Sequence, residues 1–326
     1  MRLGLFLAAQ GAAGTDPRDV AAEQVALVRE ARDAGFATVL APQHFLSGDV
    51  PMLQPIPLLG RLAAEAGTMR IGAGVLLLPL LNPVEVAEQA ATLCALAPAG
   101  VVIGVGMGYR AVEDDAFDVA EARVHSFTAR LAAVRGLLEG REVTAEGPGF
   151  RLERARLAIA PAEPPAIWMA ANRDAAVRRA ARLADAWLVN PHATLDTVER
   201  QMAILRGERG ADPVEVPVAR EACVAPTDEE ALAAAAPHLA AKYRTYLDWG
   251  QDRAMPEGDD LSGGFEELRA GRFIIGSPAT AAAQLRELRD RTGATEVIVR
   301  VAWPGLPVED ALRSVRLLGA EVAPLV

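Results

Sequence analysis

The sequence predicts an α/β protein that folds as a single (β/α)8 barrel. Apolar runs of strand length alternate with longer helical patterns, and eight such strand–helix units can be counted along the chain. Strands that alternate with helices pair in parallel through right-handed crossovers. The chain has 326 residues, which exceeds the roughly 250 that a barrel of this kind usually needs. Because no repeat or low-complexity linker interrupts the pattern, we expect one domain over residues 1–326.

The first half of the chain supplies four of these units. We expect strands over residues 2–7, 37–41, 69–78 and 100–106, and helices over residues 16–35, 55–67, 82–98 and 121–139. Asp16 before Pro17 and Asn82 before Pro83 mark two helix starts, since a side-chain oxygen caps free N–H groups and proline suits the first turn. A hairpin is expected over residues 141–160, outside the alternating pattern.

The second half supplies four more strands and a long insertion. We expect strands over residues 165–171, 185–189, 214–225 and 296–303, and helices over residues 173–184, 194–207, 228–248, 277–293 and 307–322. Residues 224–275 separate the seventh strand from its barrel helix and contain a glycine- and acid-rich stretch at 250–264. We expect this insertion to act as a lid that keeps water out of the barrel mouth.

Composition and charge exclude several classes of function. Hydrophobic residues make up 51% of the chain and charged residues 23%, which favours a large core over disorder. The net charge of −10 argues against a nucleic-acid partner. No apolar run is long enough for a signal peptide or a membrane span, so we expect a cytoplasmic protein with no membrane contact. Cys94 and Cys223 form no zinc-type spacing, and we expect no metal.

The stretch VVIGVGMGYR, residues 101–110, carries glycines at alternate positions: Gly104, Gly106 and Gly108. A dinucleotide fingerprint needs GxGxxG at the first strand-to-helix turn, whereas here Tyr109 takes the place of the third glycine. The stretch is the fourth strand, and we expect no helix to begin directly after it. The glycines are therefore expected to end a barrel strand and let a ligand approach the backbone, or else to relieve crowding inside the barrel.

The carboxyl ends of barrel strands are where such enzymes place their chemistry. The residues expected there are His44, Gly74, Val75, Gly106, Met107, Gly108, Tyr109, Ala171, Asn172, Asn190, Glu221, Arg300 and Trp303. This set combines one imidazole and a few amides with apolar and aromatic surface. No ligand cluster for a metal and no GxSxG elbow occurs, so a glycine-opened mouth of this kind favours a large flat cofactor.

Several stretches together, in order along the chain, resemble the bacterial luciferase-like flavin-dependent monooxygenase family. They include TVLAPQHF (38–45), IGAGVLLLPLLNPVEVAEQAATL (71–93), VVIGVGMGYRAVEDDAF (101–117), PPAIWMAANRDAAVRRAARLADAWLVNP (164–191) and IIGSPATAAAQLREL (274–288). The resemblance implies a (β/α)8 barrel. It also implies either reduced FMN with oxygen, or the 8-hydroxy-5-deazaflavin coenzyme in hydride transfer.

The resemblance also implies roles for single residues. His44 would lie beside the flavin ring as a general base or a stabiliser of the oxygenated flavin, unless its role is structural. A cis peptide would join Gly74 to Val75 and back the flavin ring. Asn172 and Arg173 would begin a helix whose N-terminus binds the cofactor phosphate. The whole predicted cofactor set is Gly74, Val75, Gly106, Met107, Gly108, Tyr109, Ala171, Asn172 and Arg173.

Two departures leave the cofactor open. Met107 stands where luciferase has an arginine, and Tyr109 stands where deazaflavin-dependent glucose-6-phosphate dehydrogenases have a glutamate. We predict a homodimeric FMNH2-dependent monooxygenase that acts on a small, hydrophobic organic substrate. A separate flavin reductase would supply FMNH2, because the barrel leaves no room for a reductase domain in this chain. The alternatives are a deazaflavin-dependent dehydrogenase or reductase, and a non-catalytic flavin-binding or partner barrel.

Overall fold

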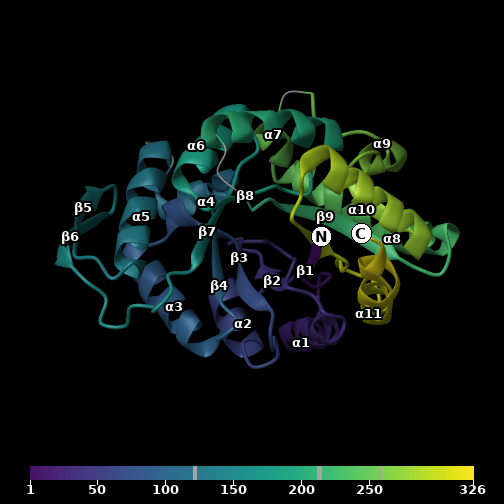
Figure 1. Cartoon of the computed structure of the whole chain (residues 1–326), viewed down its shortest axis with the longest axis horizontal. Coiled ribbons are helices and arrows are strands. Elements are labelled where there is room, and N and C mark those ends of the chain that lie inside the picture. Colours follow the sequence, from purple (N-terminus) through teal and green to yellow (C-terminus); the bar gives the residue numbers. More distant parts are fainter. Residues whose placement is uncertain (120–122, 211–214, 257) are drawn as a thin grey trace.

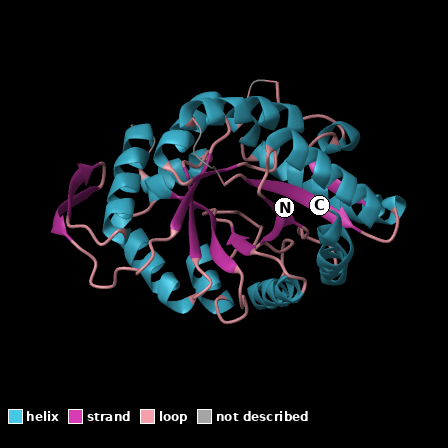
Figure 2. Cartoon of the chain, in the orientation of Figure 1, coloured by secondary structure: helices cyan, strands magenta, loops and turns pink. Residues whose placement is uncertain are grey.

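The computed structural model describes residues 1–119, 123–210, 215–256 and 258–326. Its main feature is a curled sheet surrounded by helices (Figures 1 and 2). The strands of this sheet are β1 (Arg2–Phe6), β2 (Thr38–Ala41), β3 (Arg70–Leu77), β4 (Val101–Gly106), β7 (Ala166–Ala170), β8 (Ala186–Leu188), β9 (Pro217–Val224), β10 (Phe273–Gly276) and β11 (Glu296–Arg300). The remaining two, β5 (Val143–Gly147) and β6 (Phe150–Ala155), pair as an antiparallel hairpin that stands apart from the sheet.

The helices pack mostly on the outside of the sheet. They are α1 (Pro17–Asp33), α2 (Pro55–Leu62), α3 (Pro83–Leu96), α4 (Ala111–Phe117), α5 (Arg123–Leu138), α6 (Asp174–Leu183), α7 (Leu195–Arg209), α8 (Asp228–Asp248), α9 (Phe265–Arg269), α10 (Pro278–Thr292) and α11 (Val308–Leu317). Short helical turns are η1 (Leu78–Leu80), η2 (Gln251–Ala254), η3 (Leu318–Val322) and η4 (Ala323–Leu325). As the sequence predicts, the side chains of Asp16 and Asn82 cap α1 and α3.

The sheet has nine parallel strands in the order β10-β9-β11-β1-β2-β3-β4-β7-β8. Its curl brings the two ends together: the Val189 N–H donates to the Pro217 carbonyl at 3.0 Å, and the Ala219 N–H donates to the Val189 carbonyl at 2.8 Å. Beyond this contact, the second half of β9 pairs with β10. The α/β class predicted from the sequence is confirmed.

Side chains fill both faces of this curled sheet. The inner face is packed by Phe6, Leu40, Val102, Trp168, Ala186, Leu188, Ala219 and Ile298. The outer face packs against the helices in a larger apolar core. Burial on both faces is typical of parallel sheets and explains why their strands read as nearly continuous apolar runs.

The glycines in and just after β4 have different surroundings. A Cβ on Gly104 would lie 2.1 Å from the Ala73 carbonyl oxygen of β3, so this glycine permits the close approach of two strands. Gly108 has a φ of +73°, a conformation that favours glycine. Of the two roles that the sequence left open for these glycines, relief of crowding therefore applies to Gly104.

Three elements differ from the sequence prediction, and one of them is helix α9, which lies in a part of the 224–275 insertion where no helix was predicted. Helix α4 begins at Ala111, although no helix was expected directly after the fourth strand. Glu113 and Asp114 lie in its first turn, where negative charge interacts favourably with the helix dipole. Strand β10 lies at the end of the 224–275 insertion, where no strand was predicted. The first residues of the predicted helix 121–139 and of the predicted strand 214–225 lie outside the described residues.

Candidate active site

A cavity of about 490 Å³ lies at the carboxyl ends of the sheet strands. All ten predicted site residues line it: His44, Gly74, Val75, Gly106, Met107, Gly108, Tyr109, Ala171, Asn172 and Arg173. The peptide bond between Gly74 and Val75 is cis, as the sequence resemblance implied. The carboxyl ends of the strands meet at one edge of the sheet. Residues that are more than 100 positions apart in the chain therefore line the same cavity.

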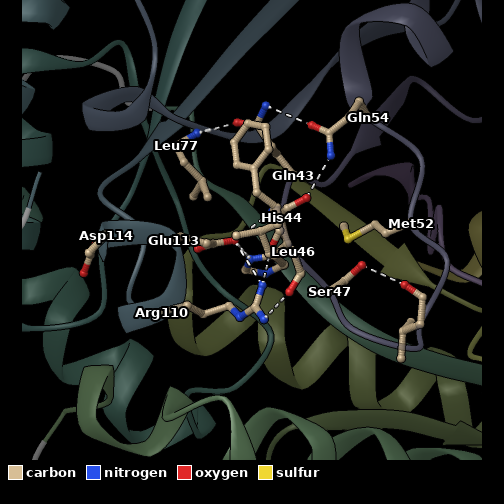
Figure 3. A network of polar contacts seen from close by, with 12 residues as sticks. Gln43, His44, Leu46, Ser47, Met52, Gln54, Leu77, Arg110, Glu113 and Asp114 are labelled. Carbon is tan, nitrogen blue, oxygen red and sulfur yellow. Dashed lines mark hydrogen bonds and ion pairs between the residues drawn. The ribbon is translucent and has the colours of Figure 1, made fainter. Parts of the chain in front are cut away.

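The loop after β2 positions His44 through hydrogen bonds to its neighbours (Figure 3). The Leu77 N–H of β3 donates to Gln43 Oε1 at 2.8 Å. Gln54, the residue before α2, donates from Nε2 to the His44 carbonyl at 2.8 Å. The two glutamine side chains also contact each other, with Gln43 Nε2 donating to Gln54 Oε1 at 3.4 Å. The backbone that carries the imidazole is thus fixed to a strand on one side and to a helix start on the other.

Glu113 of α4 contacts the His44 ring, with Nδ1 and Oε1 3.1 Å apart. The carboxylate is 1% exposed and also accepts the Phe45 N–H at 2.8 Å and Arg110 Nη1 at 3.2 Å. Burial by itself raises the pKa of Glu113, but the His44 contact, the Phe45 N–H and the Arg110 charge bring that pKa below its ordinary value. An ionised carboxylate only accepts hydrogen bonds, so Nδ1 carries the hydrogen and donates it.

This contact leaves the other ring nitrogen of His44 available. In the neutral ring the lone pair then resides on Nε2, and no described residue hydrogen-bonds to that atom. His44 is 9% exposed and lines the cavity. An imidazole held by a carboxylate on one nitrogen, with the other nitrogen free toward a ligand, can act as a general base.

Arg110 joins α4 to the His44 loop (Figure 3). Its guanidinium donates to the Phe45 carbonyl and, at 3.0 Å, to the Leu46 carbonyl, as well as to Glu113. The same group lies over the Trp249 ring, 4.2 Å from its centroid. Arg110 therefore supplies the positive charge that a buried carboxylate needs.

Aromatic rings surround His44. Their centroids lie 5.6 Å away for Tyr109, 6.4 Å for Tyr246 and 5.4 Å for Trp249. Burial raises the pKa of Tyr109 well above its usual value, and the Glu113 charge raises it further. Tyr109 is therefore a neutral phenol, and with the apolar strand ends it provides surface for a flat ring.

The charge of the cavity is opposite to that of the whole protein. Its lining contains the arginines Arg123, Arg173, Arg179, Arg253 and Arg300. Among the described residues that line it there is no aspartate or glutamate. Arg123 is paired with Asp114, but the other four arginines form no ion pair among the described residues, and they create a positive potential that attracts anions.

Helix α6 provides two of these arginines. Arg173 is its N-terminal capping residue, and no side chain caps the helix there. Asp174 in the first turn is already paired with Arg200, at 2.7 Å. Arg179 Nη1 lies 4.0 Å from Met107 Sδ. Met107 stands where luciferase has an arginine, so Arg179 of α6 places a guanidinium next to that position. The N-terminus of α6 together with Arg173 can bind an anion.

Sequence reasoning missed Glu113, Arg110, Arg179 and Tyr246. Arg110 and Glu113 are three residues apart, a spacing that would have placed both on one helix face if α4 had been recognised. Arg173, Ala176 and Arg179 follow the same three-residue spacing along α6 and all line the cavity. Tyr246 comes from α8 in the insertion, and no local sequence signal indicates that it reaches the site.

Within the four described ranges, no group of three or more His, Cys, Asp and Glu residues could hold a metal ion. In those same ranges, no helix combines the length and the apolar character needed to cross a membrane.

The sequence comparisons specify the family. The profile described as luciferase-like monooxygenase matches residues 1–296. The chain belongs to this family, which confirms the resemblance identified from its motifs.

Similar proteins include a reductase, an F420-dependent dehydrogenase and a monooxygenase solved with FMN. The 5,10-methylenetetrahydromethanopterin reductase of Methanolobus tindarius is 24% identical over 314 residues, 90% of this chain and 93% of the relative. The F420-dependent glucose-6-phosphate dehydrogenase of Beutenbergia cavernae is 30% identical over 197 residues, 58% of this chain and 56% of the relative. The oxygenating constituent of 3,6-diketocamphane monooxygenase from Pseudomonas putida, solved with FMN, shares the fold with a TM-score of 0.84 at 19% identity, covering 99% and 98% of the chains.

Proposed function

We propose that this protein is an FMNH2-dependent monooxygenase that receives reduced flavin from a separate reductase and oxygenates a largely apolar organic substrate. The observation that carries the proposal is the cavity itself, which combines cations suited to a phosphate, apolar strand ends suited to a flat ring, and the His44–Glu113 pair. We also propose that the chain is one domain and a cytoplasmic homodimer, as the sequence predicts.

The proposed barrel is closed by eight of the nine strands, β1, β2, β3, β4, β7, β8, β9 and β11. The contact of Val189 with Pro217 and Ala219 supports this closure. Residues 224–275 would form the lid, because Tyr246, Gln251 and Arg253 of this segment line the cavity.

The residues present fit a flavin that carries a phosphate. Arg173 and the N-terminus of α6 would hold the phosphate, with Arg179 adding the charge that Met107 does not supply. The backbone at Gly74, Val75 and Gly106 would lie along the ring. When bound, the reduced flavin supplies the electrons for activating oxygen.

The side chains around the ring would manage protons and water. His44 Nε2 would accept a proton from the substrate, and Glu113 would keep the ring oriented through Nδ1–H and offset the charge of the imidazolium. Tyr109, Tyr246 and Trp249 would exclude water from the reacting atoms.

A deazaflavin-dependent dehydrogenase is the second candidate. The F420-dependent relative favours it, since F420 is the 8-hydroxy-5-deazaflavin coenzyme. In that reaction His44 would accept the hydroxyl proton of an alcohol substrate, so the same pair with Glu113 serves both chemistries.

Anaerobic titration of the purified protein distinguishes the candidates. FMNH2, FMN and F420 are each added, and binding is followed by calorimetry and by the visible spectrum. Binding of FMNH2 in preference to F420 supports the monooxygenase, and the reverse preference supports the dehydrogenase. Binding of none of the three would leave the non-catalytic barrel that the sequence also allowed.

A further inference from the structure

Arg300 is a buried cation opposite Glu221 of β9, with which it forms no ion pair. It ends strand β11, is 6% exposed and lines the cavity. Among the described residues it forms no ion pair, and its side chain makes one hydrogen bond, from Nη1 to the Tyr246 hydroxyl at 3.4 Å. Its Nε is buried without an acceptor, and its guanidinium lies over the Phe6 ring, 4.5 Å from the centroid. A buried guanidinium with unmet donors is costly unless a ligand supplies the acceptor.

The neighbouring charged groups do not supply that acceptor. Glu221 forms an ion pair with Lys242 and also accepts the Trp303 Nε1–H at 2.6 Å. Glu221 and Lys242 thus neutralise each other, and the positive charge of Arg300 remains. Burial lowers the pKa of His192 well below its usual value, and the Lys242 and Arg300 charges lower it further, so His192 is neutral.

This cation lies at the His44 side of the cavity. Tyr246, which contacts Arg300, has its ring 6.4 Å from that of His44 and 5.4 Å from that of His192. The arginines suited to the cofactor phosphate belong to α6, which follows β7. Round the curled sheet, through the contact of β8 with β9, two strands still separate β7 from β11. Two anionic groups can therefore occupy one cavity at different places.

We propose that Arg300 and Tyr246 form a subsite for the carboxylate of the substrate, which would make that substrate an apolar organic acid. The inference rests on the proposed function, because it places the substrate in the same cavity as the cofactor. A guanidinium binds a carboxylate through parallel N–H donors, and the Tyr246 hydroxyl adds a donor beside it. The apolar lining would contact the rest of the molecule, and the carboxylate would hold it next to His44.

Benzoate and its neutral analogue benzamide test this subsite. Both are titrated by calorimetry into the protein alone and into the protein saturated with FMN. We expect wild type to bind benzoate about tenfold more tightly than benzamide, and Arg300→Met to lose that preference. Tyr246→Phe should lower benzoate affinity several-fold. Arg182→Met is the matched control, because it removes the same charge outside the cavity lining and should keep the preference.

Several outcomes would overturn the subsite. Equal affinity for benzoate and benzamide in wild type would do so, and so would an unchanged preference in Arg300→Met. If FMN affinity falls in Arg300→Met while the benzoate preference persists, Arg300 serves the cofactor instead. If wild type binds no flavin or F420 but still selects benzoate through Arg300, the proposed function fails and the subsite stands.

Thermal unfolding checks that the variants are folded. If Arg300→Met does not fold, Arg300→Lys and Tyr246→Phe decide the question. Lysine keeps the positive charge but lacks the planar pair of donors, and phenylalanine keeps the ring but lacks the hydroxyl. A weaker benzoate preference in both supports the subsite, and wild-type preference in both refutes it.

Discussion

At the level of single side chains, the Glu113 carboxylate determines which nitrogen of His44 is available for chemistry. Glu113 is ionised because its contacts lower its pKa despite burial, so it fixes the hydrogen on Nδ1. Without this carboxylate the neutral ring could carry its hydrogen on either nitrogen. Glu113 would thus act through His44 as a positioning residue.

Replacing Glu113 by glutamine should release the ring from this tautomer. The amide keeps the size of the side chain but loses the charge, so we expect turnover to fall by about 10²-fold with flavin affinity unchanged. The ¹⁵N shifts of His44 should show a hydrogen on Nδ1 in the neutral ring of wild type and a mixture of tautomers in Glu113→Gln. The control is Asp115→Asn, an exposed acid on the same helix. Wild-type turnover and shifts in Glu113→Gln would exclude the positioning role.

His192 should make stability depend on pH. It is 5% exposed, and its folded pKa is depressed by burial and by the Lys242 and Arg300 charges. Below about pH 6.5 the unfolded chain binds a proton that the folded chain does not, so the free energy of unfolding falls as pH falls, at up to about 1.4 kcal/mol per pH unit. Stability is restored as pH rises above that value.

His192→Asn should reduce this dependence. Asparagine keeps a polar atom where Nδ1 meets the Tyr243 hydroxyl, at 3.3 Å, but does not titrate. Urea unfolding at pH 7, 6 and 5 should show a shallower loss of stability than in wild type. The exposed His125 provides the control, since His125→Asn should leave the slope nearly unchanged. A slope in His192→Asn equal to that of wild type would contradict the argument.

At the level of elements, the β3–β4 pair depends on glycine at the contact. Gly104 would place a Cβ 2.1 Å from the Ala73 oxygen, and Gly72 would place one 2.2 Å from the Val102 oxygen. Neither distance can be relieved by moving a flexible side chain, because both neighbours are backbone atoms. These glycines therefore set how closely the two strands pack.

Gly104→Ala should destabilise the protein by roughly 3 kcal/mol or more, because backbone must shift to admit the methyl group. Gly60→Ala is the matched control, since α2 leaves open space around that position. There, alanine should be neutral or stabilise by up to about 1 kcal/mol through its better helix propensity. Urea unfolding of both variants measures the difference. Equal stability of the two would show that the strand contact tolerates a side chain.

The strands of the sheet were largely predictable because each is an apolar run bounded by turn residues. The predicted strand 100–106 is β4 (Val101–Gly106), and the predicted strand 296–303 contains β11 (Glu296–Arg300). The sequence missed the short elements α4, α9 and β10 for physical reasons. Helix α4 has seven residues, and tertiary contacts of Arg110 and Glu113 help to hold it. Strand β10 has four residues and pairs only with β9, a partner that local pattern does not reveal.

The candidate site was predictable in part for the same reason. Residues at strand ends, such as His44 and Gly106, follow from the architecture once the strands are located. Arg179 and Tyr246 reach the cavity from helices, and Glu113 reaches His44 from α4. Their positions depend on how loops and the insertion cross the strand ends. That information lies in tertiary packing and is not contained in any short stretch of sequence.

At the level of the whole molecule, charge is distributed unevenly. The chain carries a net charge of −10, yet five arginines and no described acid line the cavity. The negative surface would repel an anionic ligand at long range, whereas the cavity would attract it at short range. Because salt screens exposed charges more than buried ones, the balance between the two depends on ionic strength.

Arg173→Gln should separate the charge of the phosphate from the shape of the ring. FMN carries a phosphate and riboflavin does not, so the variant should bind FMN about tenfold more weakly and riboflavin with unchanged affinity. The matched control is Arg182→Gln on the same helix, whose side chain is 61% exposed and lies outside the cavity lining. It changes the net charge equally and should leave both affinities within about twofold of wild type.

Calorimetric titrations at low and moderate salt should show that FMN binding to wild type is more salt-dependent than binding to Arg173→Gln. If Arg173→Gln loses as much affinity for riboflavin as for FMN, Arg173 shapes the pocket. If Arg182→Gln loses as much FMN affinity as Arg173→Gln, FMN responds to the overall charge of the protein and not to a local phosphate site.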